Sequence, residues 1–242
     1  MHTKNFKKNY LQALVGALVA GTTLIGMGGK AIADNPAHLR NLLVKTECQR
    51  CELSNIDLNS LNLRGAFLNG ADLQNARLRD VNLVKAELIN VDLRNANLIN
   101  ADMRNSYIFR STMIGANLTG ANLRESRMQG VNLGMANLKG ANLIYTELAG
   151  ANLSNSNLEG AKMRNASLHR ADLSLANLKK ADLYRADLFQ ADLTNADLSG
   201  ADLSEANLSE AVITDANLVN ANLCNAVMPD GIRSKQGCPV GG

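Results

Sequence analysis

The 242-residue chain has no tryptophan and only 3% aromatic residues, although 46% of its residues are hydrophobic. Globular cores usually contain several bulky aromatic side chains, because these bury the most area per residue. The hydrophobic residues here are mainly leucine and alanine. This composition argues against an ordinary globular core and favours one built from many similar, smaller side chains.

Proline is almost absent from the chain. The three prolines are Pro36, Pro229 and Pro239, so none lies within 37–228. Proline has no backbone N–H to donate, and a central ladder of backbone hydrogen bonds therefore tolerates none. The long proline-free stretch is what such a ladder requires.

Residues that carry enzyme chemistry are scarce too. Beyond His2, near the start of the chain, only His38 and His169 remain, and neither forms a recognisable Cys–His or Ser–His arrangement. No glycine-rich phosphate loop and no calcium-binding G-G-x-G-x-D repeat is present. We expect a protein that is not an enzyme and that has no cofactor and no metal site.

What the sequence does contain is a five-residue repeat, seen clearly in ADLYR ADLFQ ADLTN ADLSG ADLSE at 181–205. The frame runs unbroken over 51–230, which is 180 residues or 36 repeats, and its central residue is always Leu, Met or Ile. Two positions earlier lies a small residue or Val, except at Ile56 and Leu61, and the residue between is usually Asp or Asn. Such regularity indicates a repeat architecture.

A period of five fits neither a straight helix nor a flat strand. Five residues advance a helix by about 500°, so the leucines would spread around its axis. In a strand, an odd period sends successive leucines to opposite faces. The pattern is satisfied if the backbone turns a corner once per repeat, with the small residue and the leucine pointing inward. Gly and Asn, which are frequent at the last position of the repeat, suit such corners.

The A(D/N)LXX pattern over 51–230 resembles that of the pentapeptide-repeat family. The resemblance implies an all-β fold, a right-handed quadrilateral parallel β-helix with four repeats in each coil. Thirty-six repeats would then make about nine coils. Residues 20 apart in the sequence would lie in one column on one side of the rod.

The segments outside the repeat predict three further parts of the chain. Residues 1–33 read as a secretory signal peptide, with basic residues, an apolar run and an Ala-Ile-Ala cleavage site; an uncleaved membrane anchor is the alternative. Residues 34–50 predict a short capping helix, with Asn35 as N-cap, Pro36 at the first helical position and leucines on one face. Residues 231–242 predict a C-terminal cap or tail. Removing 1–33 takes away four lysines and leaves 21 basic and 22 acidic residues.

The four cysteines lie in two groups, one at each end of the repeat region. An exported chain with an even number of cysteines favours disulfides, and proximity favours the pairs Cys48–Cys51 and Cys224–Cys238. A zinc site at Cys48 and Cys51 is the alternative, for which His38 is the only nearby candidate ligand before the repeats.

Several outward positions are candidates for binding. Phe109 and Phe189 share a column and are expected to be exposed contact residues for a partner. Another column contains Arg104, Arg124 and Arg164, which would suit an anionic partner or form ordinary solvated surface. Three apolar outward residues near the C-terminal end are expected to lie under the tail, or alternatively to form a homodimer face: Val212, Val219 and Val227.

Some pentapeptide-repeat proteins imitate DNA and bind gyrase, which requires negative charge along most of the rod. Here 171–228 carry nine acidic and three basic residues, but 51–170 carry ten acidic and thirteen basic residues. We therefore reject DNA mimicry and expect no nucleic-acid partner.

The flanking sequences resemble those of exported cyanobacterial members of the family, which implies the periplasm or the thylakoid lumen. We interpret the chain as an exported, non-enzymatic scaffold that binds an unidentified protein, with no membrane attachment after cleavage, as a monomer or homodimer. Self-association as a structural element is the alternative function.

Overall fold

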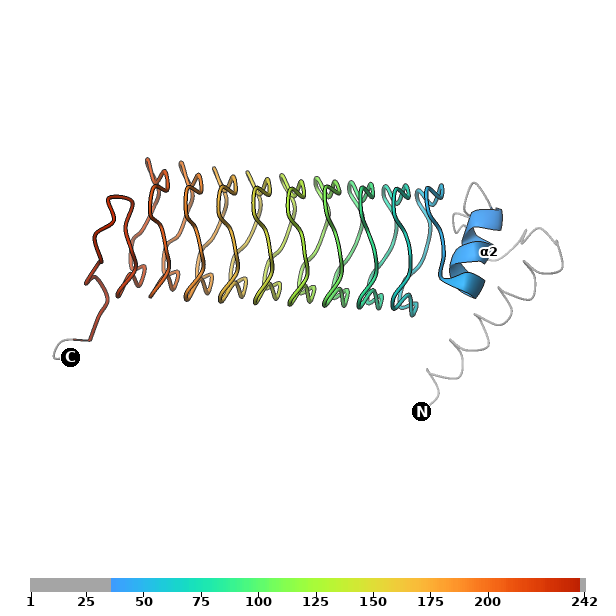
Figure 1. Ribbon diagram of the computed structural model, residues 1–242, viewed down its shortest axis with the longest axis horizontal. Coiled ribbons are helices and arrows are strands. Elements are labelled where there is room, and N and C mark those ends of the chain that lie inside the picture. Colours follow the sequence, from blue (N-terminus) through green and yellow to red (C-terminus); the bar gives the residue numbers. More distant parts are fainter. Residues whose placement is uncertain (1–35, 240–242) are drawn as a thin grey trace.

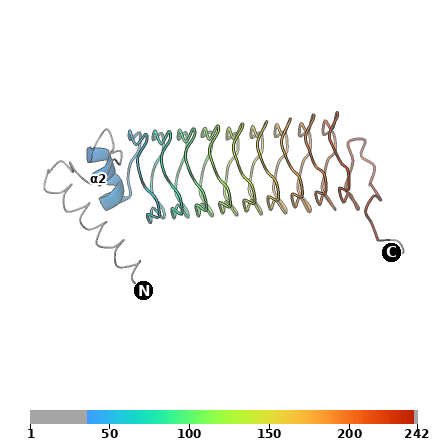
Figure 2. The same cartoon turned by 180° about the vertical axis from the view of Figure 1, so that it is seen from behind.

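The computed structural model describes residues 36–239. The predicted signal peptide and the predicted N-cap, Asn35, lie outside the described residues. Figure 1 shows a straight rod of stacked coils, with helix α2 (Pro36–Lys45) against one end and the C-terminal tail at the other. The view from behind in Figure 2 shows the same order of elements.

The coils are joined by single parallel β-bridges between residues 20 apart. The first of these joins Glu47 to Phe67 and the last joins Asn207 to Val227. Four five-residue repeats therefore complete one coil, and the rod has four sides. We call side 1 the repeat 51–55 and its equivalents every 20 residues, side 2 those of 56–60, side 3 those of 61–65 and side 4 those of 66–70. The fold is a right-handed quadrilateral parallel β-helix, as predicted.

Backbone hydrogen bonds along the repeat explain why proline is missing. In one repeat, the N–H of Asn137 donates to Ala116 O in the preceding coil at 2.9 Å, and that of Leu138 donates to Asn157 O in the next coil at 2.7 Å. The N–H of Gly140 also donates to the next coil, at 2.9 Å. The N–H of Ala141 closes the corner onto Leu138 O, at 2.9 Å. Proline at any of these positions would remove a bond that holds two coils or one corner.

The preference for Asp or Asn before the central residue has a local cause. The Oδ1 atom of Asn137 accepts the N–H of Lys139 at 3.2 Å, and Asp172 does the same for Ser174 at 2.9 Å. The side chain thereby satisfies the one N–H of these repeats that has no backbone acceptor.

Residues at the last position of the repeat adopt positive φ, from Asn55 to Asn225. Gly160 has φ 64° and Asn155 has φ 56°, values that glycine and asparagine adopt readily. Larger residues adopt the same conformation at other corners, such as Tyr145 at φ 58°. The fold therefore imposes this backbone conformation at the corner. Glycine and asparagine favour it, but other residues adopt it as well.

The core is a continuous column of central residues and alanines. Leu118, Leu138 and Leu158, in successive coils, are all fully buried. At the N-terminal end Leu39 and Leu42 of α2 are buried against the first coil. A helix lies farther from the coil than a neighbouring coil does, about 10 Å against 4.8 Å, so longer side chains are needed to fill the gap. This explains why Ile56 and Leu61 replace the small residues in that coil.

Both predicted disulfides are present. Cys48 is bonded to Cys51, next to α2, and Cys224 is bonded to Cys238, which attaches the tail to the last coil. The zinc alternative is therefore wrong for this structure. His38 has another contact: its Nδ1 atom accepts the N–H of Glu52 at 3.1 Å.

Up to Pro239, the C-terminal tail folds back over sides 3 and 4 of the last coil only. The N–H groups of Leu223, Asn225 and Met228 donate to tail carbonyls at 3.1, 2.9 and 2.9 Å. Val227 lies under the tail, where it forms an antiparallel bridge with Arg233. The prediction is wrong for Val212 and Val219, which are 47% and 62% exposed because the described part of the tail does not reach sides 1 and 2.

Candidate functional site

Aromatic side chains gather on two adjoining sides of the rod. Every phenylalanine within 36–239 belongs to side 4, as does Tyr107, whereas Tyr145 and Tyr184 belong to side 3. Phe67, Tyr107 and Tyr145 are 40%, 37% and 51% exposed. Sides 1 and 2 carry no aromatic residue in the described coils. The few aromatic side chains of the described coils are therefore concentrated on two of the four sides.

The densest part of this surface is centred on Tyr107. Its ring lies 6.3 Å from the ring of Phe109, between centroids, and the guanidinium of Arg127 in the next coil lies 5.3 Å from the centroid of Tyr107. The Arg127 guanidinium also lies 3.6 Å from a carboxylate oxygen of Glu147. We call Tyr107, Phe109 and Arg127 the Tyr107 cluster.

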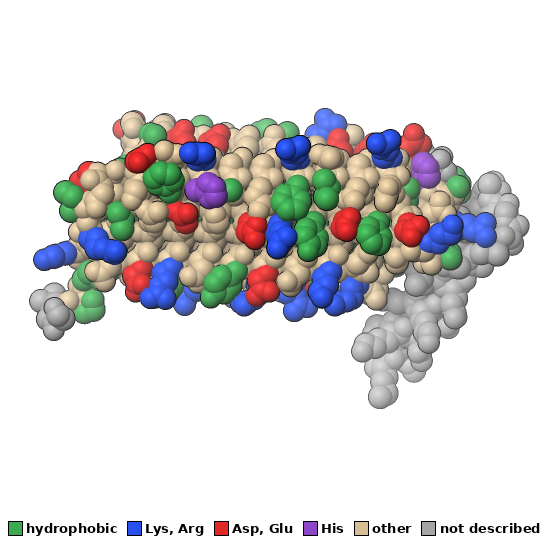
Figure 3. Space-filling model, in the orientation of Figure 1, with side chains coloured by type: hydrophobic (Ala, Val, Ile, Leu, Met, Phe, Trp, Pro, Cys, Tyr) green, Lys and Arg blue, Asp and Glu red, His purple; other side chains and the backbone are tan. Residues whose placement is uncertain are grey.

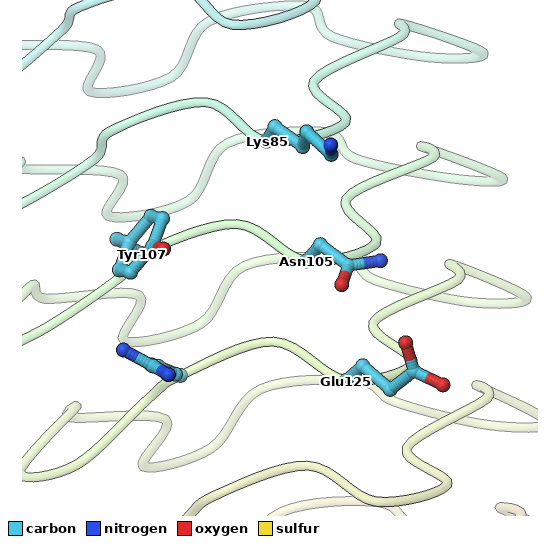
Figure 4. A pocket seen from close by; sticks show the side chains of 5 residues that line it. Lys85, Asn105, Tyr107 and Glu125 are labelled. Carbon is cyan, nitrogen blue, oxygen red and sulfur yellow. The ribbon is translucent and has the colours of Figure 1, made fainter.

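A shallow pocket of about 300 Å³ lies beside this cluster, where side 3 meets side 4. Figure 4 shows Lys85, Asn105 and Glu125 at equivalent corners of three successive coils, opposite Tyr107. Lys85, Asn105 and Glu125 are 20 residues apart in the sequence. They therefore occupy the same corner of successive coils and lie in one column. The pocket thus presents an ammonium, an amide and a carboxylate beside an aromatic ring and a guanidinium.

The predicted arginine column lies on side 3, and its members have carboxylate partners. Arg104 binds Asp102 at 2.7 Å, Arg124 binds Glu125 at 2.9 Å, and Arg164 binds Asp182 in the next coil. The hydrogen bond from Arg104 holds the pKa of the Asp102 carboxyl below its ordinary value. These pairs reduce the positive potential of the column, so its arginines lie in a locally neutral environment.

Tyr184, farther along side 3, is held by charged neighbours. Its hydroxyl donates to Glu205 at 3.0 Å, and the guanidinium of Arg185 lies 4.9 Å from its ring centroid. Desolvation raises the pKa of the Tyr184 phenol, and the hydrogen bond to Glu205 adds to this effect. This second arginine–tyrosine group resembles the Tyr107 cluster in composition but has no phenylalanine contact.

The structure does not bring the two predicted contact residues together. Phe109 and Phe189 are both half-buried on side 4, but four coils separate them, or roughly 19 Å. Tyr107 and Arg127 were missed as candidates, although the 20-residue register alone places them in one column next to Phe109. The cluster joins two adjacent columns, one with Tyr107 and Arg127 and one with Phe109, so neither column by itself reveals it.

Charge is mixed over the rest of the surface. Figure 3 shows acidic and basic side chains interspersed along the visible face, with hydrophobic side chains between them. In the acidic C-terminal part, Lys179 binds Asp197 at 3.1 Å and Arg185 binds Glu205 at 2.6 Å. Within 36–239, no group of three or more His, Cys, Asp or Glu side chains could hold a metal ion. No helix in that part of the chain has the length and apolar character to span a bilayer.

The fold and the surface define the class of this protein: a four-sided β-helical solenoid whose outward side chains are available for contacts. A sequence model described as pentapeptide repeats matches residues 51–88, 86–124, 121–160, 151–190 and 191–228. The chain belongs to the pentapeptide-repeat family.

Solved structures agree with this assignment. The chain is similar to HetL, a pentapeptide-repeat protein involved in heterocyst differentiation regulation from the cyanobacterium Nostoc sp. strain PCC 7120, with 34% identity and a TM-score of 0.65. The match covers 78% of this chain and 91% of HetL. A variant of QnrB1, a plasmid-mediated fluoroquinolone resistance protein, matches at 21% identity and a TM-score of 0.50, covering 70% of this chain and 85% of that one; it supports the fold alone. A search of curated proteins found no match.

Proposed function

We propose that this protein is an exported, non-enzymatic scaffold that binds another protein through the Tyr107 cluster. The observation that carries the proposal is the contact of Tyr107 with both Phe109 and Arg127 beside a shallow pocket. Tyrosine and arginine are the residue types that most often dominate binding energy at protein interfaces. Stacking within the cluster also holds these side chains in place before binding, which lowers the entropy lost on association.

The charges around the cluster favour a protein partner over a polyanion. Arg127 lies 3.6 Å from Glu147, and Lys85 and Glu125 line the same pocket on either side of Asn105, so both signs of charge border the cluster. A polyanion would meet repulsion at each carboxylate, whereas a protein surface can supply both signs. We infer from this that the partner presents polar or charged side chains to the pocket and an apolar side chain to the rings of Tyr107 and Phe109.

Export to the periplasm or the thylakoid lumen is part of the proposal. All four cysteines form disulfides, one pair beside α2 and one pair that attaches the tail to the last coil. Such structural disulfides persist in oxidising compartments and are rare in reducing ones. Fractionation of cells that express the full chain, with detection of the mature N-terminus by mass spectrometry, tests this part.

The binding proposal is tested by capture from the compartment fraction with the full chain as bait. Tyr107→Ala and Arg127→Ala are expected to lose a captured protein that the unchanged chain retains. Tyr184→Ala is the matched control, since it removes a tyrosine that also contacts arginine but lies outside the cluster. Phe189→Ala tests the other predicted contact residue. Equal capture by all variants would refute the role of the Tyr107 cluster.

Self-association is a second candidate function, favoured by a different observation. Val212 and Val219 are exposed at the C-terminal end, where no residue within 36–239 covers sides 1 and 2 of the last coil. Measurement of molar mass by light scattering tests it directly, because a strict monomer at every concentration would exclude this function.

A further inference from the structure

In the part of the chain that the structure describes, the C-terminal end of the rod is only half covered. In the coil beneath, the N–H groups of Leu193, Asn195, Leu198 and Gly200 donate to carbonyls of the last coil, at 2.8 to 2.9 Å. In the last coil itself, four equivalent N–H groups have no backbone acceptor within 36–239. They belong to Ile213, Asp215, Leu218 and Asn220. Unpaired N–H groups at the edge of a β structure are sites where another chain can pair.

The uncovered half also exposes core. Leu198 is fully buried, but Leu218, the next residue in its column, is only half-buried, and the same holds for Leu193 and Ile213. Val212 and Val219 add exposed apolar area beside them. The open half therefore combines free hydrogen-bond donors with apolar side chains, which favours burial against another β structure.

The shape of this end is a step. The tail forms one extra layer over sides 3 and 4, and sides 1 and 2 lie one layer lower. The border between the two halves runs diagonally across the coil. A two-fold rotation about that diagonal places the raised tail of one copy over the lower half of another, and the reverse. A stepped end of this kind is complementary to itself, as an isologous interface requires.

The same rotation pairs side chains that match chemically. Asp215 lies at the corner between sides 1 and 2, diagonally opposite the corner of residues 225 and 226, over which the tail runs. The tail carries Arg233 and Lys235 on either side of Ser234 at that corner, so the rotation brings these cations of one copy over Asp215 of the other. Opposite charges across an interface fix its register.

Apolar side chains match in the same arrangement. The rotation places side 4 of one copy over side 1 of the other. Ile232 of the tail, which lies over side 4 and is 66% exposed, then meets Val212 and Ile213 of the second copy. In a single copy, Val212 and Ile232 remain exposed and Ile213 is only half-buried against the core.

We propose that the C-terminal end is an isologous dimer interface, in which the tail of each copy covers the open half of the last coil of the other. The proposal rests on self-association as a function and adds its geometry, with Asp215 of one copy paired with Arg233 and Lys235 of the second. It is independent of the Tyr107 cluster, which lies near the middle of the rod.

The test is sedimentation analysis of the purified full chain over a range of concentrations. Asp215→Arg and Arg233→Asp are each expected to weaken dimerisation at least about tenfold, because each variant places like charges opposite one another. An equimolar mixture of the two variants is expected to restore the dimer. In the mixed dimer one charge pair is reversed, with arginine at 215 facing aspartate at 233, and the other pair keeps its original residues, Asp215 and Arg233. Asp80→Arg is the matched control, because Asp80 occupies the same repeat position near the other end.

The outcomes separate the two claims. If the unchanged chain is monomeric at all concentrations, self-association and this geometry are both wrong. If the chain dimerises but Asp215→Arg and Arg233→Asp have no effect, or their mixture fails to restore a lost dimer, self-association stands and the proposed geometry is overturned. Arginine at position 215 is compatible with the corner, since Arg110 and Arg170 adopt the same positive φ.

Discussion

Leu138 and Leu218 occupy the same column of the core, four coils apart, and differ in what lies above them. Leu138 is fully buried between two coils, whereas Leu218 is half-buried at the open end of the rod. Replacement of each by alanine removes three carbon atoms. The same chemical change should therefore have different costs, and the difference measures how much the next coil contributes.

For Leu138→Ala, the transfer of three carbons contributes about 2.4 kcal/mol, and the enclosed cavity raises the total to about 3–4 kcal/mol. For Leu218→Ala, about half of the transfer term remains and no enclosed cavity forms, so we expect about 1 kcal/mol. Both changes are made in the Asp215→Arg background, which keeps a second copy from covering Leu218.

Urea unfolding followed by circular dichroism measures the two costs. With a slope of roughly 3 kcal/mol/M, Leu138→Ala should lower the midpoint by about 1 M and Leu218→Ala by about a third of that. Equal losses in the monomer would mean that Leu218 is covered as well as Leu138 is, and would refute the half-open end. A loss below about 1 kcal/mol for Leu138→Ala would refute the close-packed core itself.

Three further outcomes are expected. Asn137→Ala should cost about 1 kcal/mol, because the N–H of Lys139 loses its acceptor, while Asn137→Asp should be nearly neutral; equal melting of the two variants would argue against this role. Replacement of Cys224 and Cys238 by serine should speed hydrogen exchange of the Leu223 N–H, which donates to the tail, but not that of the Leu203 N–H one coil earlier; unchanged exchange at Leu223 would show that the tail stays in place without the disulfide. The pKa values of Asp102 and Asp197 are lowered by hydrogen bonds, from Arg104 and Ser199 respectively, so their contribution to stability is present above the unfolded-state pKa of about 4 and is lost as pH falls through the lower folded-state values. Thermal melting should therefore move to lower temperature below about pH 4, and a melting temperature independent of pH in that range would contradict the pairing.

The sequence determined the repeat, and through it the interior of the rod. An unbroken period of five with a leucine at its centre is compatible with one arrangement only, a backbone that bends once per repeat and stacks its leucines. The absence of proline within 37–228 followed from the hydrogen bonds that this stacking requires. Even the exceptions, Ile56 and Leu61, were visible in the sequence as departures from the pattern, although only the helix beneath them explains their size.

Contacts between columns were decided by the tertiary structure. Tyr107 and Arg127 are 20 residues apart, and nothing local in the sequence couples them; the coil length brings them into contact, and the corner geometry sets Lys85 and Glu125 beside them. The path of the tail was likewise beyond the pattern, because its residues follow no repeat. Its described residues cover two sides of the last coil and leave two open. The exposure of Val212 and Val219 therefore depends on where a non-repeating segment folds back, which periodicity cannot specify.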